Sequence, residues 1–241
     1  MILKSYIVEQ DFKILNNYQS TLLYGVNDGI KGDIKSKLKN YYKGAEIINF
    51  FEEEIIKKKN ILYENIINES LFNEKKIIFI QGATDKILTE ITESLKTGKK
   101  NTIIYIFAEN LDKKSKLRNF FEKEKNLAIL ACYEDNERTL INYITKTLIN
   151  YKGLNGEIIN LIITNSNMNR KIIQSELIKI MDFFTEKKLN KDQVIEILNI
   201  KDNTNFEEIR DYALIGDKKK INKLLSEIEL LKEDSFFYLN S

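Results

Sequence analysis

The first 135 residues of this 241-residue chain alternate between short apolar runs and longer segments of helical character. The apolar runs, several of them rich in Ile, Tyr and Phe, predict buried strands at 20–24, 45–50, 77–81, 102–107 and 127–132. The segments between them predict helices at 30–42, 52–68, 84–97 and 112–124. Because repeated strand–helix units are right-handed, this alternation predicts an α/β fold with a parallel sheet covered on both faces.

After Cys132 the pattern becomes purely helical. Helices are predicted at 136–151, 157–164 and 168–187, and from the capping-box-like run at Asn190 through Leu198. We therefore expect a small all-helical domain at 136–203. Two more helices, at about 206–215 and 218–232, are predicted on either side of Gly216-Asp217 within a third region, 204–241. Two helices are too few to close a core of their own.

Composition excludes several classes of site. The chain has no histidine and a single cysteine, Cys132, so an internal disulfide, a zinc site and a Ser-His-Asp or Cys-His arrangement are not expected. The N-terminal residues lack the apolar region of a signal peptide, and no apolar run approaches the ~20 residues that span a bilayer. These features predict a cytoplasmic protein. The net charge of +2 does not indicate nucleic acid, and lysine greatly outnumbers arginine, so no single lysine carries much weight.

A degenerate phosphate loop follows the first predicted strand. In the P-loop pattern G-x-x-x-x-G-K-[ST], Gly25 and Lys31 have the right spacing, but Ile30 replaces the second glycine and Gly32 replaces the Ser or Thr. A β-branched residue disfavours the tight turn that aims N–H groups at phosphates, and Mg²⁺ loses its hydroxyl ligand. We therefore expect the layout of a nucleotide-binding domain without phosphate binding, and no cofactor, metal or catalytic residue. On spacing alone, an ordinary strand–turn–helix junction is favoured.

The order of domains is that of an AAA+ module, and five segments extend the resemblance. They are Leu22-Leu23-Tyr24-Gly25, Ser70-Leu71-Phe72 with the lysine-rich strand after it, Asn110-Leu111-Asp112-Lys113-Lys114-Ser115-Lys116-Leu117, the helix within 165–180, and Ala213-Leu214-Ile215-Gly216-Asp217. Taken in order from about residue 20 to 231, these segments resemble the delta subunit family of the bacterial DNA polymerase III clamp loader.

The resemblance implies an AAA+-like domain at 1–135, a helical lid at 136–203 and the incomplete start of a helical collar at 204–241. It implies a subunit that binds and opens the sliding clamp for loading onto primed DNA, without its own ATP hydrolysis. The implied partners are the clamp (beta subunit), the gamma/tau and delta prime subunits and primed DNA, with no membrane. No catalytic site is expected here, although the family belongs to a DNA-directed DNA polymerase holoenzyme, a nucleotidyltransferase.

The resemblance also implies that Ser70, Leu71 and Phe72 contact the clamp, with the last two inserting into its apolar pocket. These residues follow the predicted helix 52–68, whose apolar stripe is expected to dock on the sheet through Ile55, Ile56, Leu62 and Ile66. Two adjacent large apolar residues at a turn cannot easily both face one core. Without the resemblance, burial of both beneath the turn would be favoured.

A basic segment supplies possible DNA contacts. Lys113, Lys114, Lys116 and Arg118 lie where a helix begins after a strand, a position that can contact phosphates. The alternative is a solvated helix face, with Asp112 as the expected N-cap. Two other functions stay open: a divergent P-loop ATPase that uses Lys31, and an unrelated α/β interaction scaffold.

Overall fold

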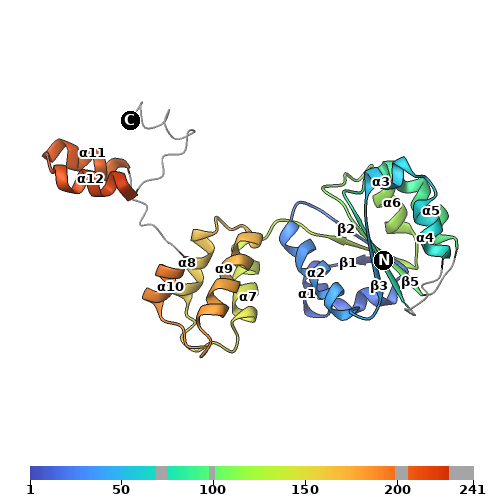
Figure 1. Cartoon of the computed structure of the whole chain (residues 1–241), viewed down its shortest axis with the longest axis horizontal. Helices are drawn as coiled ribbons and strands as arrows, with labels where there is room; N and C mark the ends of the chain where they lie inside the picture. The colour runs from blue at the N-terminus through green and yellow to red at the C-terminus, as the bar shows by residue number, and fades with distance from the viewer. Residues whose placement is uncertain (69–74, 98–100, 199–205, 228–241) are drawn as a thin grey trace. The chain divides into compact units, whose positions relative to one another are not determined.

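The structure is a computed structural model of the whole chain and describes residues 1–68, 75–97, 101–198 and 206–227 (Figure 1). The chain divides into two compact units. The first comprises Met1–Leu140 together with Met168–Gln174, and the second comprises Ile141–Asn167 together with Ser175–Ser241. The domain borders expected at residues 135 and 203 stay predictions.

The first unit is built on one parallel sheet. Within the described residues its strands are β1 (Ile2–Leu3), β2 (Ser20–Tyr24), β3 (Glu46–Phe51), β4 (Lys76–Gln81), β5 (Thr102–Phe107) and β6 (Leu127–Ala131). Their order is β1-β6-β2-β5-β4-β3, and every pairing is parallel. The predicted α/β class is therefore confirmed. The edge strand β1 was not predicted, because two residues are too few to show a period.

Helices cover both faces of this sheet (Figure 1). One face carries α1 (Ser5–Gln10), η1 (Phe12–Asn17) and α2 (Asp28–Tyr41), and the other carries α3 (Glu52–Lys57), α4 (Ile61–Ile67), η2 (Asp85–Ile87), α5 (Leu88–Leu95) and α6 (Lys116–Lys123). Successive strand residues alternate between the two cores: Leu22 packs with α3–α6, whereas Leu23 packs with α1 and α2. Burial on both faces explains why the strands are apolar throughout.

The predicted helix 52–68 is in fact two helices. α3 ends at Lys57 and α4 begins at Ile61, because the intervening Lys58-Lys59-Asn60 offers no apolar side chain to dock on the sheet. Ile55, Leu62 and Ile66 are buried as expected, whereas Ile56 is 39% exposed.

The start of α6 also differs from the prediction. Its N-cap is Ser115, whose hydroxyl accepts the Arg118 N–H at 3.2 Å, so the assignment of Asp112 as the N-cap was wrong.

The remaining described helices follow β6. They are α7 (Glu137–Thr147), α8 (Gly156–Asn165), α9 (Arg170–Phe183), α10 (Lys191–Ile197), α11 (Phe206–Ile215) and α12 (Lys218–Glu227). Asn190 caps α10 as predicted, since its side chain accepts the Gln193 N–H at 3.2 Å. Gly216, at φ +79°, separates α11 from α12. None of the helices described has the length and apolar character needed to cross a bilayer.

The sheet topology marks one place for a ligand. From β2 the chain moves outward to the edge strand β3, returns through β4 to β5, and then crosses to β6 on the other side of β2. The carboxyl end of β2 is therefore the switch point, where open parallel sheets usually bind their ligands. The loop at that point is the degenerate phosphate loop that begins at Gly25.

Candidate functional site

The loop after β2 is shaped by contact with the neighbouring strand rather than by an empty cradle. Gly25 adopts φ +122°, and a Cβ there would lie 2.3 Å from the carbonyl oxygen of Cys132, just beyond β6. Only glycine fits such an approach. Gly25 is therefore required by packing, and its match to the phosphate-binding pattern needs no ligand to explain it.

The N–H groups of this loop find partners within the protein. The Gly25 N–H donates to the Glu109 carbonyl and the Asn27 N–H to the Cys132 carbonyl, each at 3.1 Å. Asn27 also caps α2, because its Oδ1 accepts the Ile30 N–H at 3.1 Å. A phosphate cradle needs such groups free and convergent. Here the N–H groups of Gly25, Asn27 and Ile30 join the loop to adjacent strands and start the helix.

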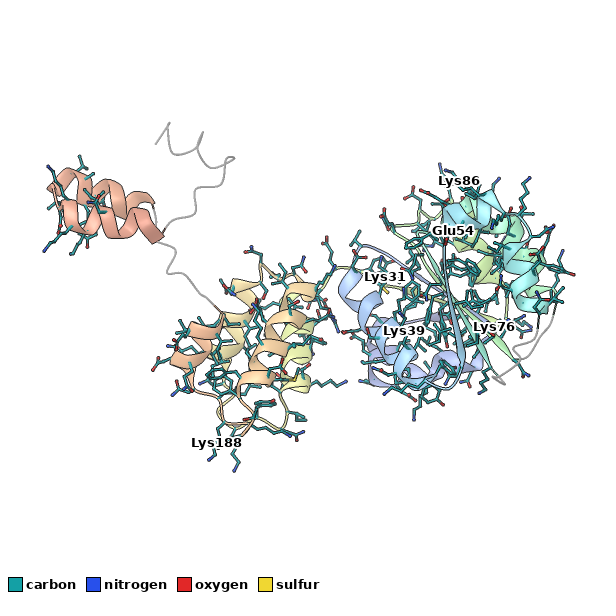
Figure 2. The ribbon with its side chains drawn as sticks, in the orientation of Figure 1. Lys31, Lys39, Glu54, Lys76, Lys86 and Lys188 are labelled. Atoms are coloured by element: carbon teal, nitrogen blue, oxygen red, sulfur yellow. The ribbon has the colours of Figure 1, made fainter. Side chains whose placement is uncertain are left out.

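Lys31 turns into the fold (Figure 2). Its side-chain Nζ donates to the carbonyls of Gly25 (2.7 Å) and Ala108 (3.1 Å) and lies 2.9 Å from Asp28 Oδ1. Lys31 is only 8% exposed, and its neighbour Ile30 is buried in the core. The three ammonium hydrogens thus have partners at these distances. Gly32, by contrast, is exposed, and no atom would obstruct a side chain there.

A buried arginine lies against the same helix start. A Cβ on Gly29 would come within 2.9 Å of the Arg170 side chain. The Arg170 guanidinium lies 3.2 Å from Asp135, 2.5 Å from Glu9 and 3.6 Å from Asp33. Both Arg170 and Asp135 have side chains only 4% exposed. Asp135 in turn accepts a 2.7 Å hydrogen bond from the Asn27 amide, which links the arginine to the loop.

These charges oppose an anionic ligand. Around the loop, four carboxylates (Glu9, Asp28, Asp33 and Asp135) accompany the two cations Lys31 and Arg170, so the local net charge is −2. A nucleotide triphosphate would meet repulsion from carboxylates whose cationic partners are already engaged. No motif in the sequence assigned a role to Arg170. Its rarity was the available signal, since an arginine retained in a lysine-rich chain is well suited to several simultaneous ion pairs.

The proposed clamp contacts Ser70, Leu71 and Phe72 lie outside the residues that the structure describes. The chain on either side is described: α4 ends at Ile67, and β4 begins at Lys76. Both of these points lie at the amino edge of the sheet, opposite the loop after β2.

The basic segment at α6 divides into two kinds of residue. Lys113, Lys114 and Lys116 are exposed. Arg118 is held inside: its guanidinium lies 5.0 Å from the Tyr24 ring centre, pairs with Glu122 at 2.8 Å and donates to the Leu111 carbonyl at 3.1 Å. The three lysines are therefore open to solvent and their DNA contacts stay a prediction, whereas Arg118 fixes α6 to β2.

The N-terminus of α6 already holds an anionic group. Asp85, from η2, accepts hydrogen bonds from the Ser115 hydroxyl (2.6 Å) and from the N–H groups of Leu117 (2.9 Å) and Lys116 (3.0 Å). Partial burial acts to raise the pKa of Asp85, but these hydrogen bonds outweigh it and the pKa is lowered. This carboxylate occupies the position that a phosphate would take.

Within the described part of the chain, no group of three or more His, Cys, Asp or Glu side chains is arranged to hold a metal ion. Cys132 is buried, and burial raises the pKa of its thiol to about 12. A thiol in that state is a packing group rather than a nucleophile.

The fold and this site define an AAA+-like α/β domain whose phosphate loop is filled by its own side chains. No protein-family model matches the chain. Over 225 residues it is 25% identical to a protein described as a probable DNA polymerase III subunit delta from Rickettsia prowazekii (strain Madrid E). That alignment covers 90% of this chain and 66% of the relative, so the chain spans just under two thirds of the relative's length.

A solved structure has a similar fold. The Bacillus subtilis DNA clamp loader delta protein superposes with a TM-score of 0.62 at 13% sequence identity, and the match covers 92% of this chain and 70% of that one. The resemblance inferred from the sequence segments is therefore confirmed: the chain is similar in sequence to a DNA polymerase III delta subunit and shares the fold of a clamp loader delta protein.

Proposed function

We propose that this chain has a clamp-loader role in DNA replication, as the delta-type subunit that binds and opens the sliding clamp without hydrolysing ATP itself. The observation that carries the proposal is the sequence similarity to a DNA polymerase III delta subunit over 90% of this chain. The shared fold alone hosts many activities, so it is this similarity, together with the site, that supports the function.

The state of the phosphate loop supports the part of the proposal that excludes ATP hydrolysis. Lys31 is occupied by two main-chain carbonyls and Asp28, and the loop N–H groups named above have internal partners. Arg170 is held by carboxylates beside the same helix. Binding of ATP would require Lys31 to leave these partners and the phosphates to approach a region of net negative charge. A subunit that works by binding alone needs none of this.

Clamp opening by binding alone is physically sufficient. A wedge that binds the open clamp more tightly than the closed one shifts the population by its differential affinity. Reversing a 1:99 ratio of open to closed clamp requires roughly 5.5 kcal/mol of such preference. We assign the wedge to Leu71 and Phe72, with Ser70 beside them, because an aromatic–aliphatic pair in a pocket is a common interface anchor.

The proposed partners follow from the same role. They are the sliding clamp (beta subunit), the gamma/tau and delta prime subunits, and primed DNA. Because Lys113, Lys114 and Lys116 are exposed next to one another, we assign phosphate contacts to them. Arg118 is assigned a packing role, since its guanidinium is already engaged by Tyr24, Glu122 and Leu111.

The decisive experiment measures binding of the purified chain to its sliding clamp by surface plasmon resonance. The double variant Leu71→Ala/Phe72→Ala should bind at least thirtyfold more weakly, since anchor truncations cost on the order of 2 kcal/mol or more and about 1.4 kcal/mol equals a decade. Its melting temperature should hardly change. As a matched control, Ile149→Ala/Ile178→Ala removes two apolar side chains that are 72% and 55% exposed, and it should bind normally.

The alternatives make opposite predictions. A scaffold in which Leu71 and Phe72 belong to the core would show no clamp binding by the unaltered chain and a sharp fall in melting temperature for the double variant. A divergent ATPase would bind ATP–Mg²⁺ with micromolar affinity and lose it on Lys31→Ala. Either result would overturn the proposal.

A further inference from the structure

A cavity of about 380 Å³ lies beside the edge strand β1 of the first unit. Its lining comes from β1 and the start of α1, from α6, and from the carboxyl ends of β2 and β6. β6 contributes the side chains of Ile129 and Ala131 to it. The strand β1 has two residues and pairs with β6, so its free side is too short for another strand to extend the sheet. A ligand at this place would therefore be held by the side chains that line the cavity.

Two tyrosine rings in the lining are largely exposed. Tyr6 of α1 is 55% exposed, and Tyr133, just beyond β6, is 60% exposed. The hydroxyl of Tyr133 nevertheless lies 3.4 Å from the Tyr24 hydroxyl, and its carbonyl accepts a hydrogen bond of 3.0 Å from the Asn27 amide. The rings of Tyr24 and Tyr133 meet edge to face, with 6.4 Å between their centres. An exposed ring held in this way has few conformations to lose, so it is pre-organised to receive another planar group.

The wall that α6 contributes to the cavity is polar but balanced in charge. The Arg118 guanidinium lies 5.0 Å from the Tyr24 ring centre, and its Nε pairs with Glu122 at 2.8 Å. All three residues line the cavity. Because the arginine and the glutamate neutralise each other, neither presents an isolated charge to a ligand. The cavity therefore favours recognition of a flat ring through its faces over recognition of a single charged group.

Exposed lysines lie on two of the segments that line the cavity. Lys4 is itself a lining residue, and its Nζ is 5.9 Å from the Tyr6 ring centre. The exposed lysines of the segment 113–116 lead into the first turn of α6, two residues ahead of the lining residue Arg118. Proteins that bind single-stranded nucleic acid combine such cations, which contact phosphates, with aromatic rings on which the bases stack.

We propose that this cavity holds an unpaired base of single-stranded DNA, stacked on Tyr133 and Tyr6, while Lys4 and the segment 113–116 contact neighbouring phosphates. The inference rests on the proposed function, which brings primed DNA and therefore a single-stranded template to this subunit. It adds a contact to a DNA base to the phosphate contacts assigned above. Because every base has a π-face, the contact does not depend on sequence. Arg118 keeps its packing role and forms part of the wall.

The test follows the fluorescence anisotropy of a labelled oligothymidylate titrated with the full chain at low salt. Tyr6→Ala/Tyr133→Ala should bind about tenfold more weakly, because the rings that stack on the base are gone. Tyr6→Phe/Tyr133→Phe keeps both rings and should bind within about twofold of the unaltered chain. The matched control is Tyr41→Ala/Tyr63→Ala, which removes two tyrosines that are 48% and 44% exposed on α2 and α4 and should also bind within about twofold.

An abasic strand of the same length separates stacking from charge. It keeps the phosphates but has no bases, so the unaltered chain should bind it about tenfold more weakly than oligothymidylate. Tyr6→Ala/Tyr133→Ala should bind the two strands alike. Lys4→Ala should weaken binding of both strands to the same degree, because a phosphate contact does not depend on the base. The melting temperature of the double alanine variant should hardly change, since both rings are largely exposed.

The outcomes distinguish this site from the proposed function. If the unaltered chain binds the clamp but the double alanine variant binds oligothymidylate as well as the unaltered chain does, only the base site is overturned. The same holds if that variant loses affinity for the abasic strand to the same degree, or if it loses affinity for the clamp in place of oligothymidylate. In the last case the cavity receives a protein side chain. If the ring-dependent binding of oligothymidylate is found without clamp binding, the base site stands and the proposed function fails.

Discussion

Lys31 and Lys76 are both buried, and they lie at opposite edges of the same sheet (Figure 2). Each donates two hydrogen bonds to main-chain carbonyls, and each has one carboxylate neighbour: Asp28 for Lys31 and Glu46 for Lys76. At the carboxyl edge, these contacts fill the place where a parallel sheet usually binds its ligand. At the amino edge, they fix the end of α4 to the first residue of β4.

The comparison shows that the same local chemistry can fill the place of a ligand at one edge and anchor a helix end at the other. A lysine whose ammonium donates to loop carbonyls cannot also donate to a phosphate. The contacts at the carboxyl edge therefore hold the fold together and do not bind a ligand. A lysine that donates to the carbonyls at a helix end fixes that helix to the sheet. The carboxyl edge therefore contributes mainly to stability, and we expect changes there to alter folding more than binding.

The largest effect is expected from Arg170→Met. Removing this guanidinium leaves Asp135, with a side chain 4% exposed, without its ion-pair partner, and breaking such a buried pair costs about 3–5 kcal/mol. Chemical denaturation monitored by circular dichroism would measure the loss. Arg138→Met, which removes an exposed arginine nearby, should change the unfolding free energy by less than about 0.5 kcal/mol. Equal stability of the two variants would mean that the carboxyl edge is not held by this network.

Lys31→Met should come next, with a loss of about 2–3 kcal/mol in unfolding free energy, because the carbonyls of Gly25 and Ala108 lose their buried donor. Lys39→Met, an exposed position on the same helix, is the control. Neither the unaltered chain nor either variant should bind labelled ATP in an equilibrium titration with Mg²⁺. Saturable ATP binding that disappears in Lys31→Met would reverse the comparison and make the carboxyl edge a ligand site.

Asp85→Ala tests a second helix that begins at the carboxyl edge of the sheet, namely α6. It should cost about 1 kcal/mol, the usual value for loss of a capping side chain, since Ser115, Lys116 and Leu117 all donate to this carboxylate. Asp112→Ala, which removes the residue that local sequence favoured as the cap, should cost little. If thermal melts rank the two variants in the opposite order, the capping role belongs to Asp112.

Acidity gives an independent measure of the same contact. Folding lowers the Asp85 pKa below its ordinary value of 3.8, so its contribution is fully present above that value and is lost as pH falls through the folded-state pKa. Between about pH 7 and about pH 3, the unaltered chain should therefore lose more stability than Asp85→Ala. Parallel losses in the two proteins would contradict the lowered pKa.

The smallest effect is expected from Lys113→Ala/Lys114→Ala/Lys116→Ala. Stability should stay within about 0.5 kcal/mol, because all three side chains are exposed. Affinity for primed DNA, measured by fluorescence anisotropy, should fall by about threefold, with a shallower dependence on salt. The control replaces Lys57, Lys58 and Lys59, three exposed lysines elsewhere in the first unit. An equal loss of DNA affinity in both triple variants would show only a general effect of charge.

Local sequence was sufficient for most of the fold of the first unit. The predicted strands at 20–24 and 102–107 match β2 and β5, because residues buried on both sides of a sheet are apolar without interruption. The loss of phosphate-loop chemistry could also be predicted from the sequence, since Ile30 and Gly32 replace residues that the pattern requires. Local sequence predicted the ends of helices and the breaks between them less well, as at Lys58–Asn60 and Ser115, where tertiary contacts select among several possible caps.

The sequence by itself determined the fold class, the position of the loop after β2 and the resemblance to delta subunits, because all three depend on the order of residues and on short-range periodicity. Only the tertiary structure decided that Lys31 and Lys76 turn inward, that Arg170 lies beside Gly29, and that Asp85 caps a helix beginning 31 residues later. The physical reason is that these contacts join groups far apart in the chain. They also bury charged side chains, which sequence patterns assign to the surface because burial is unfavourable until every donor and acceptor has found its partner.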